Sequence, residues 1–203
     1  MNTTTKRIIV AMTGASGAIY GIRFLKRAIQ HFDHVYLSIS EQAIQVINTE
    51  LQLSLAQGRV TPIDLLGQSC DNVTMLDRKD YFSPPASGSF RHDGMVIVPC
   101  SMGTAGRIAN GISDDLVTRA ADVCLKERRP LILVPREMPW NLIQLRNMTQ
   151  LAEAGATIMP ASPSFYYNPG SVEELADTVV ARLLQHLGVE QEVVPQWQFQ
   201  EPE

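Results

Sequence analysis

Residues 8–18, IIVAMTGASGA, decide the fold of this 203-residue chain. The apolar run from Ile8 to Met12 predicts a buried strand, and Gly14 and Gly17 bracket the turn that follows it. From Ala18 onward, apolar residues recur at helical spacing. Glycines permit a close backbone approach, and a helix start offers unpaired N–H groups and a positive dipole end. The stretch therefore predicts a strand, a turn and a helix that bind a phosphate. A plain tight turn is the alternative.

The rest of the chain continues the same alternation of short apolar runs and helical periodicity. Further strands are expected at residues 34–39, 73–76, 95–98, 131–134 and 157–159. Further helices are expected at residues 41–55, 102–109, 115–126, 141–154 and 171–187. Ser171 and Glu174 have the spacing of a capping box at the start of the last helix. Strands separated by helices imply right-handed crossovers, and hence a parallel α/β sheet.

Composition narrows the class of protein. A chain of 203 residues suits one domain, and a net charge of −4 argues against a nucleic-acid partner. No stretch approaches the roughly 20 apolar residues that span a bilayer, so no membrane contact is expected. Three widely spaced cysteines form no disulfide framework, which indicates a reducing, cytoplasmic location. The four histidines show no ligand spacing, so no metal site is predicted.

Ligands of parallel α/β sheets bind beyond the carboxyl ends of the strands, so the segments that follow the strands are the candidates. Ser40 follows the second strand and either contacts a ligand or only caps a helix. The turn 99–106 (PCSMGTAG) is a second small, hydroxyl-rich entry into a helix. Its Cys100 is more readily a buried thiol than a nucleophile. Arg136 suits a phosphate and Glu137 suits proton transfer, with a surface ion pair as the alternative.

Basic residues offer a second candidate for anion binding. Lys126, Arg128, Arg129 and Arg136 form a candidate anion site, or the first three only complement the end of a helix. Arg182 lies among the apolar residues of the last helix, where a charge needs a partner. That partner is either a ligand phosphate or a protein carboxylate.

Taken together, these segments resemble the UbiX flavin prenyltransferase family over residues 6–197. The stretches that carry the resemblance are 12–18 (MTGASGA), 86–89 (ASGS), 120–123 (AADV), 125–130 (LKERRP) and 134–137 (VPRE), with Phe165-Tyr166 and Ala181-Arg182. The resemblance implies a Rossmann-like or flavodoxin-like α/β fold with three layers, in which helices flank a central parallel sheet. It implies one FMN-binding domain over residues 1–189, with a tail at 190–203 that packs near the active site.

The resemblance also implies an activity. A dimethylallyl group would pass from dimethylallyl phosphate to N5 and C6 of reduced FMN, without a metal. The prenylated FMN would serve a UbiD-type decarboxylase as its cofactor. The subunits would form a homododecamer whose active sites are shared between neighbours. The sequence leaves open whether the donor is a monophosphate or a diphosphate.

Residue roles follow from the positions that match the family motifs. The expected FMN contacts are Gly14, Ala15, Ser16, Ser40, Ser101, Met102, Gly103, Thr104 and Arg136. The expected prenyl-phosphate contacts are Gly88, Lys126, Arg136, Tyr166, Arg182 and Trp197. The expected catalytic residues are Glu137, Lys126, Ser16, Glu50 and Tyr166. Gly88 is expected to reach the site of an adjacent subunit, and Glu50 to lie near a neighbour's flavin.

Two other functions are compatible with a flavin-binding α/β domain. An FMN-dependent cysteine decarboxylase of the related flavoprotein group would need a histidine base, but His31 and His34 come only at the far end of the first helix. A non-catalytic electron-transfer module would explain FMN binding. It would leave Lys126, Glu137 and Tyr166 without a role.

Overall fold

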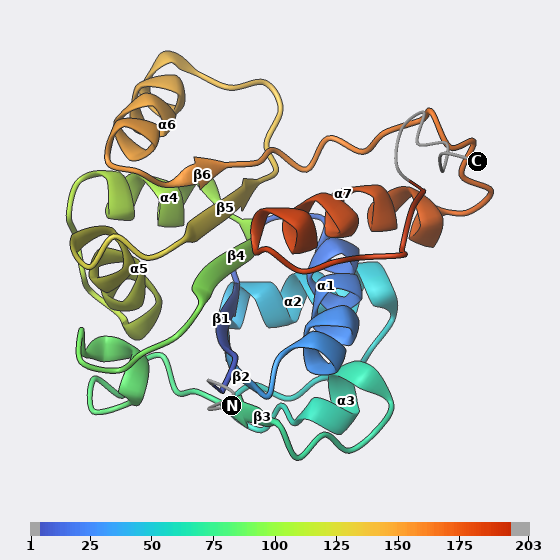
Figure 1. Cartoon of the computed structure of the whole chain (residues 1–203), viewed down its shortest axis with the longest axis horizontal. Coiled ribbons are helices and arrows are strands. Elements are labelled where there is room, and N and C mark those ends of the chain that lie inside the picture. Colours follow the sequence, from blue (N-terminus) through green and yellow to red (C-terminus); the bar gives the residue numbers. More distant parts are fainter. Residues whose placement is uncertain (1–4, 196–203) are drawn as a thin grey trace, which may run out of the picture.

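The structure, a computed structural model, describes residues 5–195 and contains one six-stranded sheet. All five strand pairings are parallel, and the order across the sheet is β3-β2-β1-β4-β5-β6. The strands are β1 (Arg7–Met12), β2 (His34–Ile39), β3 (Val73–Met75), β4 (Gly94–Cys100), β5 (Leu131–Pro135) and β6 (Thr157–Ile158). The predicted parallel α/β architecture is confirmed (Figure 1).

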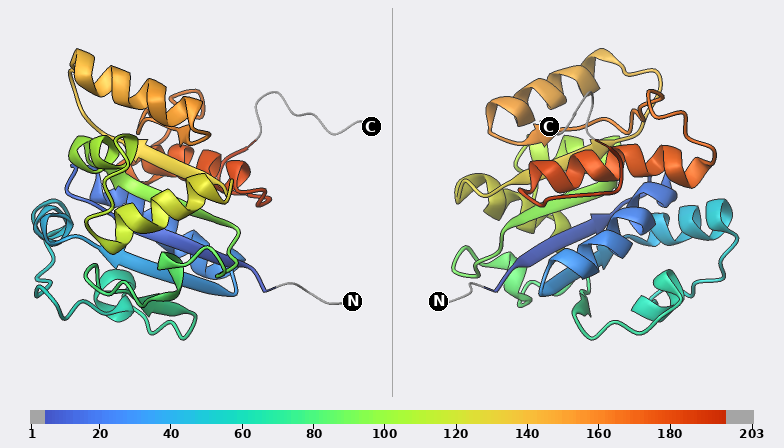
Figure 2. Two further views of the ribbon diagram at one scale, coloured as in Figure 1. Left: turned by 90° about the vertical axis from the view of Figure 1, so that its left-hand side faces the viewer. Right: turned by 45° about the vertical axis from the view of Figure 1, so that its right-hand side comes forward.

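Helices connect the strands and cover both faces of the sheet (Figure 2). They are α1 (Ala18–His31), α2 (Glu41–Leu51), α3 (Pro62–Leu66), α4 (Met102–Ala109), α5 (Leu116–Lys126), α6 (Leu142–Glu153) and α7 (Val172–His186), with a 3-10 turn, η1, at Pro84–Ala86. The sequence did not predict α3 or η1. Both begin with proline at the first helical position, a signal for a short helix that was available.

Alternation along β1 divides the buried core into two layers. Ile8, Val10 and Met12 face one side of the sheet and pack in a cluster with residues of α1, α2 and α7. Ile9 and Ala11 face the other side and pack with residues of α4, α5 and α6. Side chains of consecutive strand residues point to opposite faces, so a continuous apolar strand must be covered on both. This is the predicted three-layer arrangement.

The direction of chain winding reverses between β1 and β4. From β1 the chain winds outward through β2 to β3, and from β4 it winds the other way through β5 to β6. The loops after β1 and β4 therefore diverge toward opposite faces of the sheet. Ligands of such sheets bind in the crevice that this divergence leaves at the carboxyl ends of the strands.

Two local predictions need correction. Helix α2 ends at Leu51 rather than at residue 55, because Gln52 adopts a left-handed conformation with φ 54°. The Asn48 side chain then bonds both the N–H and the carbonyl of Leu55, which holds the returning chain. At α7, Ser171 caps Glu174 N as expected, but the Glu174 carboxylate accepts from Gly170 N, so the capping box is incomplete.

Residues 5–195 contain neither a membrane-spanning helix nor a metal cluster. No helix there is long and apolar enough to cross a membrane. No group of three or more His, Cys, Asp or Glu side chains in that range is placed to hold a metal ion.

Leu25 tests the packing of α1 against the sheet. Leu25 is fully buried in the core, whereas the adjacent Lys26 is exposed on the same helix. We expect Leu25→Ala to lower the free energy of unfolding by about 2–5 kcal/mol, because it removes buried methyl groups and leaves a cavity. Lys26→Ala should change it by about 0.5 kcal/mol or less. Urea unfolding followed by circular dichroism measures both, and equal effects would contradict this packing.

Candidate active site

Thr13 joins the two turns that flank the crevice. Its N–H donates to Pro99 O over 3.1 Å, and its hydroxyl Oγ1 accepts from Ser101 N over 2.8 Å. Thr13 is buried, so these bonds are shielded from water. The glycine turn after β1 is therefore held beside the Ser101 turn after β4, as the sequence predicted.

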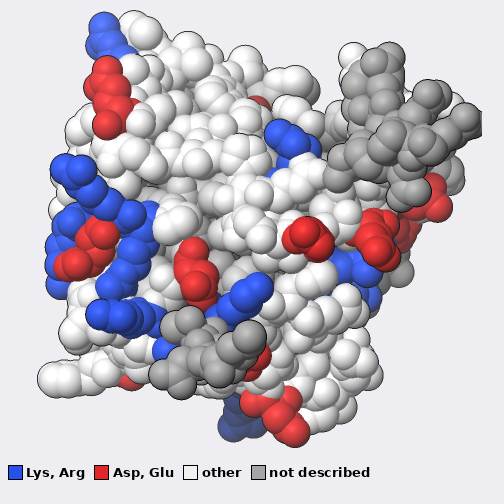
Figure 3. Space-filling view, in the orientation of Figure 1, with Lys and Arg blue, Asp and Glu red and all other residues white. Residues whose placement is uncertain are grey.

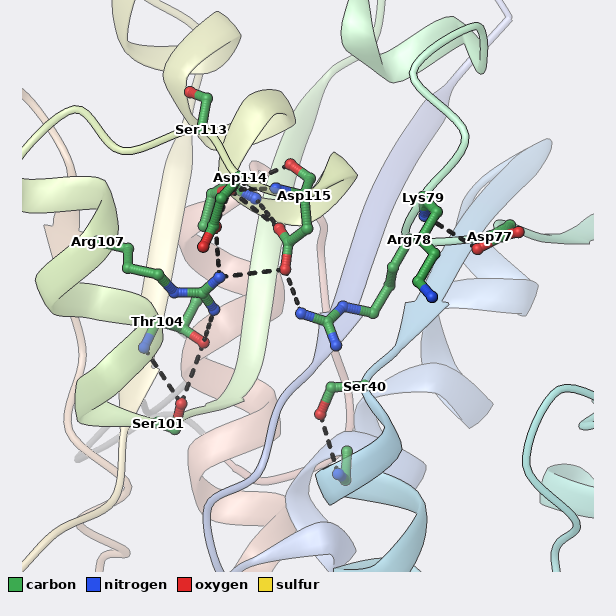
Figure 4. Close-up of polar contacts among 12 residues, drawn as sticks. Ser40, Asp77, Arg78, Lys79, Ser101, Thr104, Arg107, Ser113, Asp114 and Asp115 are labelled. Atoms are coloured by element: carbon green, nitrogen blue, oxygen red, sulfur yellow. Dashed lines mark hydrogen bonds and ion pairs between the residues drawn. The ribbon is translucent and has the colours of Figure 1, made fainter.

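Two helices begin at this crevice with a serine cap. Ser40 Oγ accepts from Ala43 N over 2.9 Å at the start of α2, and Ser101 Oγ accepts from Thr104 N over 3.3 Å at the start of α4. Ser101 also donates from its hydroxyl to Thr104 Oγ1 over 3.0 Å. The capping alternative for Ser40 is thus correct, yet capping also places Ser40 at the positive end of a helix dipole. We call Ser40, Ser101 and Thr104 the hydroxyl cradle (Figure 4).

The start of α1 is occupied by a carboxylate of the chain itself. Glu50 accepts hydrogen bonds from Gly17 N and Ala18 N at 2.7–3.0 Å. The N–H groups that the sequence assigned to a phosphate therefore already have an anionic partner. The expectation of a phosphate at this helix start is wrong for the isolated chain. The first glycine turn forms a wall of the crevice, and the hydroxyl cradle lies at the two other helix starts beside it.

Arg136 contacts the glycine turn from the end of β5. Its Nε donates to Ser16 O over 3.1 Å, and its side chain lies 3.7 Å from where a Cβ of Gly17 would be. Gly17 has φ 102°, which a residue with a side chain adopts only with strain. Burial raises the pKa of the nearby Tyr20 phenol, and the positive charge of Arg136 partly opposes that rise. Arg136 is thus held at the mouth of the crevice.

Glu137 shares the turn with Arg136 but is exposed. Its carboxylate accepts from Met138 N over 3.1 Å, and its carbonyl accepts from the Trp140 indole over 2.8 Å. It makes no ion pair with Arg136, so the alternative of a surface ion pair between these two residues is wrong. A carboxylate presented in this way is free to exchange a proton with a ligand.

An arginine network beside the hydroxyl cradle was missed from the sequence. Arg78 and Arg107 both pair with the carboxylate of Asp115, and Arg107 also reaches Asp114 and Thr104. These side chains line a cleft of about 490 Å³, which is within the range of small-molecule sites. Arg78 and Arg107 are 29 positions apart with no motif between them. The Asp115 helix cap was the only local signal that could have pointed to the network.

Lys126 lies at the opposite edge of the sheet. It ends α5 just before β5 begins, and it forms an ion pair with Glu127. Lys126 Nζ lies 2.8 Å from the point where a Cβ of Gly88 would be, so a side chain at residue 88 would displace the flexible end of Lys126. Gly88 and Lys126, two of the expected prenyl-phosphate contacts, therefore lie side by side. The seven-residue strand β4 separates their edge from the hydroxyl cradle by about 20 Å.

The predicted cluster of four cations does not form. Arg129 donates to the carbonyls of Gly88 and Phe90, and so holds the segment before β4 rather than an anion. Arg136 is at the far edge of the sheet from Lys126 and Arg129. Figure 3 shows Lys and Arg side chains gathered over the end of α5 and the segment before β4. That surface is basic but is not the crevice.

The remaining predicted contacts are dispersed in the single chain. Tyr166 is 75% exposed on the loop that follows β6. Arg182 is exposed on α7, and its Nη1 donates to Gln185 Oε1 over 2.6 Å. Among the described residues its partner is thus the amide of Gln185, not the protein carboxylate that the sequence offered as one alternative. Trp197 lies outside the described residues. The structure therefore brings the FMN set together but separates the prenyl-phosphate set.

Comparison with known proteins agrees with a flavin site. The Flavoprotein family model matches residues 1–187. Flavin prenyltransferase UbiX of Pseudomonas aeruginosa is 46% identical over 198 residues, which cover 95% of this chain and 94% of that protein. AnUbiX (PadA1), solved in complex with FMN and dimethylallyl pyrophosphate, superposes with a TM-score of 0.85 at 40% identity, covering 98% and 100% of the two chains.

A further solved structure gives the oligomeric state of a similar protein. The dodecameric FMN-dependent UbiX-like decarboxylase from Escherichia coli O157:H7 superposes with a TM-score of 0.83 at 38% identity, covering 95% of this chain and 100% of that one. Fold and crevice thus define a flavoprotein of the parallel α/β class. Within that class, the chain belongs to the UbiX flavin prenyltransferase family.

Cys100 tests whether this site uses a thiol. Burial raises the pKa of the Cys100 and Cys124 thiols to about 12, whereas Cys70 is partly accessible. We expect a thiol reagent at pH 8 to label native protein at Cys70, and to label Cys100 and Cys124 only after unfolding. The reason is that the thiolate is the reactive form and buried thiols are shielded. Peptide mass spectrometry measures the sites, and rapid labelling of native Cys100 would contradict a purely structural thiol.

Proposed function

We propose that this protein is a flavin prenyltransferase, which transfers the dimethylallyl group of a dimethylallyl phosphate to reduced FMN. The observation that carries the proposal is the convergence of Ser40, Ser101, Thr104 and Arg136 on one crevice at the carboxyl edge of the sheet. The chain in which they converge is 46% identical to a flavin prenyltransferase over nearly its full length.

FMN fits the crevice by chemistry. A phosphate needs several donors and a positive dipole, and the hydroxyl cradle supplies hydroxyls at the N-termini of α2 and α4. The guanidinium of Arg136, 3.1 Å from Ser16 O, is suited to a polar edge of the isoalloxazine ring. Gly14, Ala15 and Ser16 form the wall between these two ends. Met102 and Gly103 lie in the first turn of α4, next to the cradle.

The prenyl-phosphate contacts fit a site shared between subunits. Lys126 and Gly88 lie at the edge where strands begin, whereas Arg136 and Glu137 lie where strands end. One chain cannot bring both groups to one ligand across a sheet about 20 Å deep. A homododecamer, the assembly of the UbiX-like relative, permits one subunit to present Lys126 and Gly88 to the crevice of another.

In the proposed reaction, some residues stabilise the charges that develop and one residue transfers a proton. Reduced FMN supplies the nucleophile when it is bound. As the C–O bond of the donor breaks, the electron pair leaves on phosphate, where Lys126 and Arg182 stabilise the negative charge. The ring of Tyr166 stabilises the allylic cation by cation–π attraction, worth about 2 kcal/mol in a dry site. Bonding of the prenyl alkene to flavin C6 would need one proton on the alkene and would release one from C6, and Glu137 is placed to carry protons between these sites.

Ser16 and Glu50 have positioning roles in this proposal. Ser16 is exposed on the turn that Arg136 contacts, so its hydroxyl faces the flavin. Glu50 holds the backbone of that turn through Gly17 and Ala18. Its carboxylate is exposed at the surface, where a neighbouring subunit can approach.

The histidines disfavour a cysteine decarboxylase that depends on a histidine base. His31 ends α1, His34 begins β2, His92 precedes β4 and His186 ends α7. All four therefore lie at the edge where strands begin, opposite the hydroxyl cradle. A base at that edge cannot reach a substrate bound beside the flavin of the same chain.

The proposed product implies a partner enzyme, and the cysteines indicate the cellular compartment. A prenylated flavin is of use only to an enzyme that takes it as a cofactor, and the proposal assigns it to a UbiD-type decarboxylase. Three unpaired cysteines fit the reducing cytoplasm. We further propose that residues 1–189 are the FMN-binding domain and that the tail at 190–203 brings Trp197 near the prenyl group.

The mass of the flavin after the reaction tests the proposed prenyl transfer directly. We expect purified protein, mixed anaerobically with reduced FMN and dimethylallyl phosphate, to increase the flavin mass by one dimethylallyl group in place of a hydrogen. Liquid chromatography with mass spectrometry measures the product, and parallel reactions with the diphosphate identify the preferred donor. Folded protein that binds FMN but leaves its mass unchanged with both donors would sink the proposal.

Lys126 tests the assignment of the two phosphates. We expect Lys126→Ala to leave FMN affinity nearly unchanged and to lower kcat/KM for the prenyl donor by about a hundredfold or more, because a fixed cation at the leaving group is lost. Arg128→Gln, a nearby exposed cation, is the matched control. Loss of FMN binding as the main defect would place Lys126 at the wrong phosphate.

Complementation tests whether sites are shared. Lys126→Ala and Glu137→Gln subunits, co-expressed with different tags, should form mixed assemblies more active than either variant alone. Each mixed assembly contains sites in which an intact Lys126 edge meets an intact Glu137 edge. Activity that never exceeds that of the single variants would place both residues in a site within one chain.

A further inference from the structure

We propose that Arg78 and Arg107, joined by the carboxylate of Asp115, extend the hydroxyl cradle and recognise the phosphate monoester of FMN. This inference rests on the proposed function, because it names residues of this chain that select the phosphorylated flavin. Neither arginine belongs to the set of FMN contacts that the family resemblance implied.

Arg107 touches the hydroxyl cradle directly. It lies in α4 one turn after Thr104, and its Nη2 donates to Thr104 Oγ1 over 3.3 Å. Thr104 Oγ1 in turn accepts from Ser101 Oγ. The Arg107 guanidinium thus contacts a hydroxyl in the first turn of α4, where the helix dipole already favours an anion.

Arg78 approaches the same space from the opposite side. It follows β3, and its carbonyl accepts from Leu116 N over 2.8 Å, which ties its backbone to the start of α5. In Figure 4 the Arg78 side chain points across the carboxyl edge of the sheet, with Asp115 above it and Ser40 below. The two guanidiniums thus face each other across a space that the cradle serines close from below.

Asp115 holds both arginines in this arrangement. Its side chain is 9% exposed and accepts from Arg78, from Arg107 and from Thr118 N. Burial acts to raise the pKa of Asp115, but the bonds from Thr118 and Arg78 outweigh it and hold the pKa below its ordinary value. Asp115 is therefore ionised at neutral pH. A carboxylate fixed in this way orients the arginines before a ligand arrives.

The network retains capacity for a further anion. Arg78 Nε is buried without a hydrogen-bond partner among the described residues, although buried donors are nearly always paired. Asp115 balances only one of the two positive charges, and the side chain of the other carboxylate, Asp114, is 54% exposed to water, which screens it. A phosphate between the arginines would accept several of the five donors that each guanidinium carries.

A purely structural ion-pair network is the competing explanation. Arg78, Arg107 and Asp115 would then only fasten the segment after β3 to the start of α5. The two explanations differ in which flavins should bind more weakly when an arginine of the network is replaced. A structural network affects all flavins alike, whereas a phosphate clamp affects FMN but not riboflavin, which has the same ring and ribityl chain without the phosphate.

Flavin titrations of single variants distinguish these explanations. Quenching of flavin fluorescence gives the dissociation constants of FMN and riboflavin for the full-length protein and for Arg78→Gln and Arg107→Gln. We expect each variant to weaken FMN binding by about tenfold or more and to leave riboflavin binding nearly unchanged, because a charge-assisted hydrogen bond is lost. Lys79→Gln is the matched control, since Lys79 lines the same cleft but contacts none of the cradle hydroxyls.

The outcomes separate the inference from the proposed function. Selective loss of FMN affinity, with partial recovery in Arg107→Lys, supports the phosphate clamp. Unchanged FMN affinity, or equal loss of FMN and riboflavin with a lower melting temperature of the flavin-free variant, overturns the clamp and leaves the prenyltransferase proposal intact. Wild-type protein that binds neither flavin overturns both.

Discussion

The hydrogen bonds of Thr13 between the ends of β1 and β4 are the contact on which the site depends. They bind together two turns that leave the sheet in opposite directions, at the point where the winding of the chain reverses. Because both turns are anchored to buried parallel strands, the helix starts behind them are placed rigidly. The hydroxyl cradle, the Arg136 contact and the arginine network all lie around this one junction.

A second constraint is the depth of the sheet. The residues that would handle the flavin lie where strands end, and Lys126 with Gly88 lies where strands begin. Because the two edges cannot serve one ligand within a chain, the proposed function requires an assembly of subunits as the catalytic unit. In that proposal the fold of one chain builds the crevice, and packing between chains supplies the contacts to the leaving group. The proposal also couples assembly to turnover, because the crevice of an isolated subunit would bind flavin with no Lys126 beside the prenyl donor.

The helix starts around the crevice differ in whether a carboxylate of the chain already accepts from their N–H groups. At the α1 start, Glu50 already pairs the free N–H groups, so the glycine turn that looked most like a phosphate site is closed to one. At the hydroxyl cradle, Asp115 and Thr118 arrange charge without consuming every donor. In the proposed function the phosphate therefore binds at the helix starts of the hydroxyl cradle and not at the start of α1. Local sequence motifs do not reveal which of several helix starts is occupied from within.

The sequence by itself determined the parallel α/β fold, because continuous apolar strands and the 3.6-residue periodicity of the helices are local properties. It also determined that the segments after strands would form the site, since parallel strands end at one edge. Only the tertiary structure decided that Glu50 caps α1, that Arg129 holds a backbone segment, and that Arg78 and Arg107 meet at Asp115. Most of these contacts join residues 32 to 41 positions apart, and Arg107 and Asp115, 8 positions apart, lie on separate elements. Their partners are chosen by packing in three dimensions, which no local pattern of residue types encodes.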